Sequence, residues 1–228
     1  MKNKIVLIAG PTASGKSSLA NTLAKKIDGE IVNADSMQIY KDLEILTARP
    51  KPKKNDPNHH LYGFVNGEEL WSVGKWINEA KKVTEKILRK NSIPIIVGGT
   101  GLYFKAITDG LSPIPDINQE IRDNLKEELN SKGLENLYNE LKFTDIKAHE
   151  SIDKNDQQRI IRALEVYRGL GKKISEYWEL DRTKVFEDNF IKIKLSTNRE
   201  ELYKSCDDRC DDMFQLGVVE EVKSLIEL

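Results

Sequence analysis

The sequence is poor in cysteine and has no long hydrophobic run. Its two cysteines, Cys206 and Cys210, stand one helical turn apart, with no second pair and no histidine nearby. The sequence therefore predicts neither a disulfide framework nor a closed zinc site. No apolar stretch approaches the length of a membrane span, and the apolar residues from Ile5 to Ala9 are too few for a secretory signal. We therefore expect a cytoplasmic protein that has no membrane partner.

The sequence also lacks an excess of charge of either sign. It has 36 Lys and Arg against 37 Asp and Glu, which gives a net charge of −1. A protein that bound nucleic acid over its whole surface would be strongly basic, so any RNA contact is expected to be a local basic patch. A hydrophobic content of 39% over 228 residues is typical of a folded protein with one sizeable core and room for a smaller inserted domain.

The periodicity of apolar residues predicts alternating strands and helices. Strands are expected at 4–9, 30–34, 93–97 and 190–195, and helices at 17–27, 72–90, 118–131, 134–141, 156–169 and from 198 towards 217. Residues 43–67 show no sustained period and predict a long surface loop. The pattern indicates an α/β fold with a parallel, P-loop NTPase-like sheet, helices on both faces and an inserted helical domain. The expected divisions are 1–115 for the first part of the core, 116–186 for the insertion and 187–228 for the return to the core.

A phosphate-binding loop joins the first expected strand to the first expected helix. It is formed by Gly10, Pro11, Thr12, Ala13, Ser14, Gly15, Lys16 and Ser17, which fit the pattern GxxxxGK[ST]. In such a loop the backbone amides and the helix N-terminus face phosphate oxygens, Lys16 adds a positive charge and Ser17 can ligate Mg²⁺. The loop predicts binding of a nucleotide or another di- or triphosphate, without defining the reaction.

Two further residues follow expected strands, where ligands collect in parallel sheets. Asp35 could be a general base, a magnesium ligand or a residue that caps a turn. Thr100, between glycines, could place a hydroxyl beside the reacting atoms or could belong to a tight turn.

A third candidate region is the expected helix at 156–169. Arg159 and Arg162 share the face opposite its apolar residues, together with Gln158. From Lys147 to Lys173 there are seven Lys or Arg against four Asp or Glu. Such an excess would suit an RNA backbone, although a charged face is also what solvent exposure alone produces.

Taken in order, several sequence blocks resemble the tRNA dimethylallyltransferases. They are GPTASGKS at 10–17, DSMQ at 35–38, TARP at 47–50, HHLYGF at 59–64, GGTGLYFKA at 98–106, the stretch 118–122, NDQQRIIRALEV at 155–166 and the RxxxM block that begins at Arg209. The blocks span most of the chain, and several are not shared with phosphate-loop kinases in general.

The resemblance implies a reaction and a set of roles. The donor is dimethylallyl diphosphate, held by the phosphate loop with Mg²⁺, and the acceptor is the exocyclic amine of the adenosine next to the anticodon in the tRNA anticodon stem-loop. Asp35 is implied to be the base, with Thr100 beside the reacting atoms and Lys16 and Arg209 on the departing diphosphate. The residues implied to hold the tRNA are Asp35, Ser36, Met37, Gln38, Thr100, Arg122, Gln158, Arg159, Ile160, Ile161 and Arg162. A monomer is expected.

The sequence departs from the family pattern at three places. Arg49 and Ser205 stand where the family commonly has Lys and Arg. The chain also stops at Leu228 within an amphipathic segment, so we expect a form truncated at its C-terminus. Two other functions fit the phosphate loop alone: a small-molecule kinase, and a nucleotide-dependent RNA-binding module without catalysis.

Overall fold

A parallel sheet forms the centre of the larger part of the protein. The computed structural model describes residues 4–187 and 189–226. The strands are β1 (Ile5–Ala9), β2 (Gly29–Asn33), β3 (His59–His60), β4 (Ile93–Gly98) and β5 (Phe190–Lys194), in the spatial order β3-β2-β4-β1-β5. Every pairing is parallel. The carboxyl ends of β2, β4 and β1 therefore lie next to one another at one edge of the sheet.

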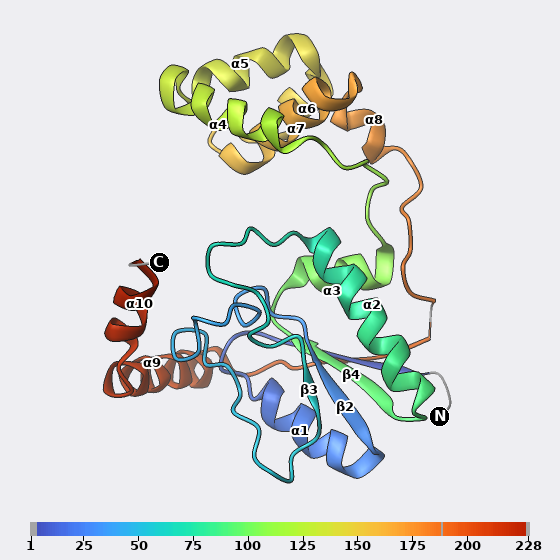
Figure 1. Cartoon of the computed structure of the whole chain (residues 1–228), viewed down its shortest axis with the longest axis vertical. Helices are drawn as coiled ribbons and strands as arrows, with labels where there is room; N and C mark the ends of the chain where they lie inside the picture. Colours follow the sequence, from blue (N-terminus) through green and yellow to red (C-terminus); the bar gives the residue numbers. More distant parts are fainter. Residues whose placement is uncertain (1–3, 188, 227–228) are drawn as a thin grey trace. The chain divides into compact units, whose positions relative to one another are not determined.

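Helices cover both faces of this sheet (Figure 1). On one face, α1 (Lys16–Ile27) packs Ala20 and Ala24 against side chains of β1, β2 and β4. On the other face lie α2 (Val73–Arg89), whose N-terminus is capped by the Ser72 hydroxyl, and α3 (Gly101–Asp109). The Trp76 ring of α2 stacks on Tyr103 of α3 with centroids 4.0 Å apart. The expected α/β class is confirmed.

Residues Leu111–Thr183 form a second compact unit made of helices. Its helices are α4 (Gln119–Lys132), α5 (Leu134–Thr144), α6 (Ile146–Ser151), α7 (Gln157–Leu170) and α8 (Ile174–Trp178). It has a hydrophobic core of its own, around Leu125, Leu141 and Leu164. The two ends of the unit are joined, because Leu111 and Thr183 exchange both backbone hydrogen bonds, at 3.2 and 2.8 Å. The unit begins and ends a few residues before the boundaries expected from the sequence.

The chain then returns to the first unit, Met1–Gly110 with Lys184–Leu228. Strand β5 adds to the outer side of β1, and α9 (Arg199–Gln215) and α10 (Val218–Ile226) follow it. Asn198 caps α9 through a hydrogen bond to the Glu200 amide, at 2.9 Å. None of the helices in the described part of the chain is long and apolar enough to cross a membrane.

The prediction for residues 43–67 was wrong in one respect. The segment contains β3, and it buries Leu43 and Val65, so it is not a loop that lies wholly on the surface. Short helices were also missed: α3, α6 and α8 were not predicted, because a helix of one or two turns shows too few apolar positions to establish a period.

Candidate active site

The phosphate loop follows β1 and is closed by hydrogen bonds within itself. The Ser14 hydroxyl donates to the Pro11 carbonyl at 2.8 Å, and the Lys16 ammonium donates to the same carbonyl at 2.5 Å. Gly15 is in the left-handed conformation, with φ of 80°, and is the N-cap of α1. The loop thus delivers Lys16 and the start of α1 to the edge where β2 and β4 end.

The loop after β2 is held against the loop after β4. The Thr100 hydroxyl accepts from the Ser36 amide at 2.9 Å and donates to the Ser36 hydroxyl at 3.3 Å. The backbone of Ala34 passes so close to Gly98 that a Cβ there would lie 2.0 Å from the Ala34 carbonyl oxygen, and only glycine fits. Thr100 therefore fixes the 35–38 loop through Ser36.

Asp35 has one carboxylate oxygen engaged in its own loop. Its Oδ1 accepts from the Met37 amide at 3.0 Å, and its backbone amide donates to the buried Asn33 side chain at 2.9 Å. Within residues 4–187 and 189–226, Oδ2 accepts no hydrogen bond from the protein. This oxygen lies over Gly99, where a Cβ would be 3.8 Å away. Asp35 does cap a turn, and its second oxygen is left for a ligand.

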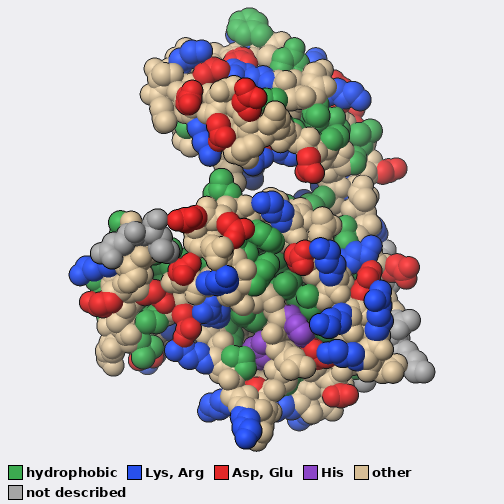
Figure 2. Space-filling model, viewed as in Figure 1, with side chains coloured by type: hydrophobic (Ala, Val, Ile, Leu, Met, Phe, Trp, Pro, Cys, Tyr) green, Lys and Arg blue, Asp and Glu red, His purple; other side chains and the backbone are tan. Residues whose placement is uncertain are grey.

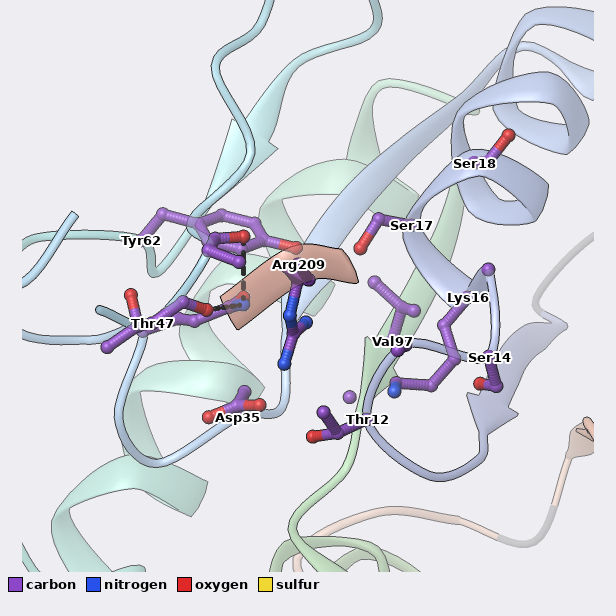
Figure 3. A pocket seen from close by; sticks show the side chains of 15 residues that line it. Thr12, Ser14, Lys16, Ser17, Ser18, Asp35, Thr47, Tyr62, Val97 and Arg209 are labelled. Carbon is purple, nitrogen blue, oxygen red and sulfur yellow. Dashed lines mark hydrogen bonds between the residues drawn. The ribbon is translucent and has the colours of Figure 1, made fainter. Parts of the chain in front are cut away.

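These segments enclose a pocket of about 220 Å³ (Figure 3). Its lining comes from the phosphate loop and α1 (Thr12, Ala13, Ser14, Gly15, Lys16, Ser17, Ser18), from the loops that follow β2 and β3 (Asp35, Gln38, Thr47, Ala48, Tyr62), from the end of β4 (Val97, Gly98) and from α9 (Arg209). The structure therefore brings Lys16, Asp35, Gln38 and Arg209 together. Thr100, Ser36 and Met37 do not line the pocket; Met37 is half exposed.

Sequence reasoning missed several lining residues, Tyr62 in particular. It belongs to the HHLYGF block, which offered the only signal for it. Burial, and then the nearby charge of Asp35, raise the pKa of the Tyr62 phenol, so it is a neutral hydrogen-bonding group at physiological pH.

The pocket contains two positive charges and one negative charge. Burial lowers the pKa of Lys16; Asp35 acts in the opposite direction, and Arg209 lowers the pKa further. The lysine therefore lies in a partly dry site beside a second cation, where an anionic ligand would be stabilised. Within the described residues the Arg209 side chain makes no ion pair or hydrogen bond, which leaves its guanidinium available to such a ligand.

Gln38 is oriented by the neighbouring loop. Its Nε2 donates to the carbonyls of Thr47 and Ala48, at 2.9 and 3.4 Å, as the dashed lines in Figure 3 indicate. Arg49 stabilises this loop by donating hydrogen bonds to the Tyr40 carbonyl at 2.8 Å and to the Glu44 carboxylate at 3.1 Å. Arg49 is mostly buried and is a structural residue of the loop.

The helical unit places the other predicted residues. Glu165, only 3% exposed, accepts from Arg122 Nε at 3.0 Å and pairs with Arg162 at 3.0 Å, so one buried carboxylate orients two arginines. Sequence reasoning missed Glu165, whose signal is an acidic residue within the apolar run ALEV. Arg159 is 75% exposed and pairs with Asp156 at 3.0 Å, and Gln158 is exposed.

One predicted RNA contact is wrong. Ile160 is fully buried in the core of the helical unit, so its side chain has no surface to offer to RNA. Ile161 is partly buried and packs against the same core. On the face drawn in Figure 2, basic and acidic side chains are interspersed, in agreement with the small net charge.

The described residues include no cluster of three or more His, Cys, Asp or Glu side chains that could hold a metal. The Ser17 hydroxyl lines the pocket at the start of α1. Since Mg²⁺ usually keeps water ligands and binds through substrate phosphates, this set of donors fits an ion that arrives with a diphosphate.

Comparison with known proteins matches the whole chain to one family. The IPP transferase family model matches residues 38–228, and the isopentenyl transferase model matches residues 3–64. The tRNA dimethylallyltransferase of Pelagibacter ubique is 42% identical over 228 residues, which are all of this chain and 73% of that protein. The enzyme of the same name from Rhizobium rhizogenes is 44% identical and is matched over 74% of its length.

Solved structures give the same result. A eukaryotic dimethylallyltransferase acting on tRNA aligns with a TM-score of 0.81 at 32% identity, over 98% of this chain and 56% of that one. The tRNA isopentenylpyrophosphate transferase of Bacillus halodurans aligns with a TM-score of 0.65 at 32% identity, over 99% of this chain and 71% of that one. The chain therefore belongs to the tRNA dimethylallyltransferase family of prenyl-transferring enzymes.

Proposed function

We propose that this chain transfers the dimethylallyl group of dimethylallyl diphosphate to the exocyclic N6 amine of the adenosine that follows the anticodon in tRNA. The allylic C–O bond breaks, a C–N bond forms, and diphosphate leaves with the electron pair. The observation that carries the proposal is the pocket lined by Lys16, Arg209 and Asp35, whose Oδ2 accepts no hydrogen bond from the described residues.

The positive charges in the pocket indicate which residues would bind the diphosphate of the donor. As the C–O bond breaks, negative charge grows on the leaving diphosphate and must be met by fixed positive groups. The loop amides, Lys16 and Arg209 are such groups, and Ser17 would hold a Mg²⁺ ion that neutralises part of the diphosphate charge.

The hydrogen-bonding groups of the pocket indicate which residues would bind the acceptor adenosine. The N6 amine becomes nucleophilic as it loses a proton, and Asp35 Oδ2 is the group that would take it. The acceptor base must leave its stack to reach the pocket, and the Gln38 carboxamide would read its edge. Ser36, Met37 and Thr100 would support this end, with Thr100 acting through its hydrogen bonds to Ser36.

The helical unit would hold the anticodon stem-loop. Arg159 presents its charge to solvent, and Arg122 and Arg162 are held by ion pairs with Glu165. Gln158 and the partly exposed Ile161 complete this face. The monomeric state and the cytoplasmic location remain predictions.

Radiolabelled transfer tests the function. The chain is incubated with labelled dimethylallyl diphosphate, Mg²⁺ and an unmodified anticodon stem-loop RNA, and the RNA is digested to nucleosides. We expect label in a single N6-substituted adenosine. An RNA with guanosine at that position is the matched control and should take up none. Consumption of ATP without transfer to RNA would instead support a kinase.

A further inference from the structure

We propose that Glu221, on α10, is a positioning residue for the acceptor end of the pocket. It would act by holding the 43–48 loop in the shape that orients Gln38. This inference rests on the proposed function, in which Gln38 reads the acceptor base, and it gives a role to a residue that lies outside the pocket lining.

The Glu221 carboxylate binds three consecutive backbone amides. Its Oε1 accepts from Glu44 and Ile45, both at 2.7 Å, and its Oε2 accepts from Leu46 at 2.8 Å. Such hydrogen bonds to an ionised acceptor are about twice as strong as those between neutral groups. The contact joins two parts of the chain that lie more than 170 residues apart.

The 43–48 loop behaves as a single helical turn. The Ala48 amide donates to the Ile45 carbonyl at 2.9 Å, and the Thr47 hydroxyl donates to the Leu43 carbonyl at 2.7 Å. A helical turn leaves its first amides without partners, and here a carboxylate from another helix caps them. At the other end of the turn, the carbonyls of Thr47 and Ala48 accept from Gln38. Glu221 and Gln38 therefore hold opposite ends of the same turn.

Apolar packing offers the α9–α10 segment little other support. None of the α9 residues is buried, and Val218 is the only described residue of α10 that is. One apolar contact is made by Leu225, whose side chain lies against Gly67: a Cβ added to Gly67 would lie 2.6 Å from the Leu225 Cδ1 atom. The carboxylate is therefore expected to carry a large share of the contact between α10 and the loop.

Hydrogen exchange tests the contact itself. We expect Glu221→Ala to speed exchange of the amides of Glu44, Ile45 and Leu46 about tenfold or more, because a lost capping contact of ~1.4 kcal/mol is a factor of ten in opening. Glu221→Gln, which keeps one acceptor oxygen, should lie between Glu221→Ala and the parent. Glu220→Gln, an exposed carboxylate next to it, is the matched control. Unchanged exchange in Glu221→Ala would overturn the proposal.

A double-mutant cycle tests the route through Gln38. We expect Glu221→Ala to weaken binding of the anticodon stem-loop RNA about three- to tenfold, and we expect this loss to disappear in a Gln38→Ala background, because the two residues act through one turn. Pyrophosphate, which the proposed function assigns to the phosphate loop and to Arg209 of α9, should bind within about twofold of the parent's affinity. A larger loss would mean that Glu221 acts by holding α9 in place instead of through the turn, and would overturn the proposal.

The outcomes separate the two proposals. A loss of RNA affinity that is equally large with and without Gln38 means that Glu221 is only a tether, and refutes the positioning role. A parent chain that binds pyrophosphate and RNA but transfers no label refutes the proposed function, whereas the hydrogen exchange and the binding cycle still decide the role of Glu221.

Discussion

At the residue scale, the proposed chemistry depends on how the two oxygens of Asp35 are used. Oδ1 is engaged by the Met37 amide, which fixes the direction of the carboxylate. Oδ2 accepts no hydrogen bond from the described residues, and Asp35 lines the same cavity as Lys16 and Arg209. A carboxylate anchored in this way loses little freedom when a substrate binds, so capping the turn and acting as a base are compatible roles for the same side chain.

Asp35→Asn separates the base from the other roles. The amide keeps the size and the capping hydrogen bond but cannot take a proton, so the single-turnover rate should fall by ~10²–10⁴ while RNA and pyrophosphate binding are kept. Rates are measured at saturating substrates across a magnesium series. If extra Mg²⁺ restores the rate of Asp35→Asn, Asp35 is a metal ligand. If the rate is normal at every Mg²⁺ concentration, Asp35 only caps the turn. Asp116→Asn, an exposed carboxylate, is the control.

Lys16→Ala should abolish most of the pyrophosphate binding that calorimetry detects, because it removes the charge at the centre of the phosphate loop. Lys26→Ala, an exposed lysine of the same helix, should bind as the parent does. Because the pKa of Lys16 is lowered from 10.5, the ammonium loses its proton before the pH reaches that value. As the pH is raised, the parent's affinity for pyrophosphate should therefore begin to fall before pH 10.5. Equal affinity of Lys16→Ala and the parent would exclude the lysine from the site.

At the element scale, the regular core was predictable and the 43–67 segment was not. β1, β2, β4 and α2 follow from runs of apolar residues with a clear period, and their observed ends lie within a residue or so of those expected. The shape of 43–67 depends on Arg49, Asp42 and Glu221, whose partners lie up to 177 residues away in sequence, so no local pattern could reveal it. Tyr62 lies in this segment, so its place in the pocket could not be predicted from a local pattern either.

The phosphate loop was the most predictable part of the site, because its residues are contiguous and fit one pattern. Asp35 followed from its position after a strand, whereas Gln38 and Arg209 entered only through the family resemblance. Ile160 was wrongly assigned to RNA binding together with the neighbouring arginines of the same sequence block. It lies on the apolar face of the helix, which packs into the core of the helical unit.

The exposed face of α7 gives a prediction at this scale. Arg159→Glu should weaken binding of the stem-loop RNA and lower the slope of log affinity against log salt by roughly one, since each phosphate contact contributes about 0.7–0.9. Arg162→Glu should do the same, with some loss of stability because Glu165 then faces a like charge. Lys82→Glu on α2 is the control. RNA affinity that is unchanged across the salt series would make the face merely solvated.

At the scale of the whole molecule, two hydrophobic cores predict two unfolding steps. The helical unit has an ion-pair network of its own, in which Arg168 bonds Glu128 at 2.6 Å and Glu140 at 2.7 Å. Arg168, and then Lys132, lower the pKa of Glu128 to about 2. Since the folded pKa lies below the ordinary value of 4.5, the stabilisation is complete above pH 4.5 and is lost as the pH falls towards 2.

Glu128→Gln should therefore lower one calorimetric transition at pH 7 and leave the other in place. The difference from the parent should shrink as the pH is lowered from about 4.5 to about 3, where the parent's carboxylate begins to gain its proton. Glu127→Gln, its exposed neighbour, should match the parent. If both transitions shift together, the two units unfold as one.

The position of β5 has a consequence for synthesis on the ribosome. β1 is made first, yet its outer neighbour is made only after the entire helical unit has been translated. Until then β1 has an open edge, and open edges recruit strands from other chains. The helical unit, with joined ends and a core of its own, can fold during this interval. Substitutions that slow the emergence or folding of that unit should therefore reduce the yield of newly made protein through aggregation, even where the finished molecule is as stable as before.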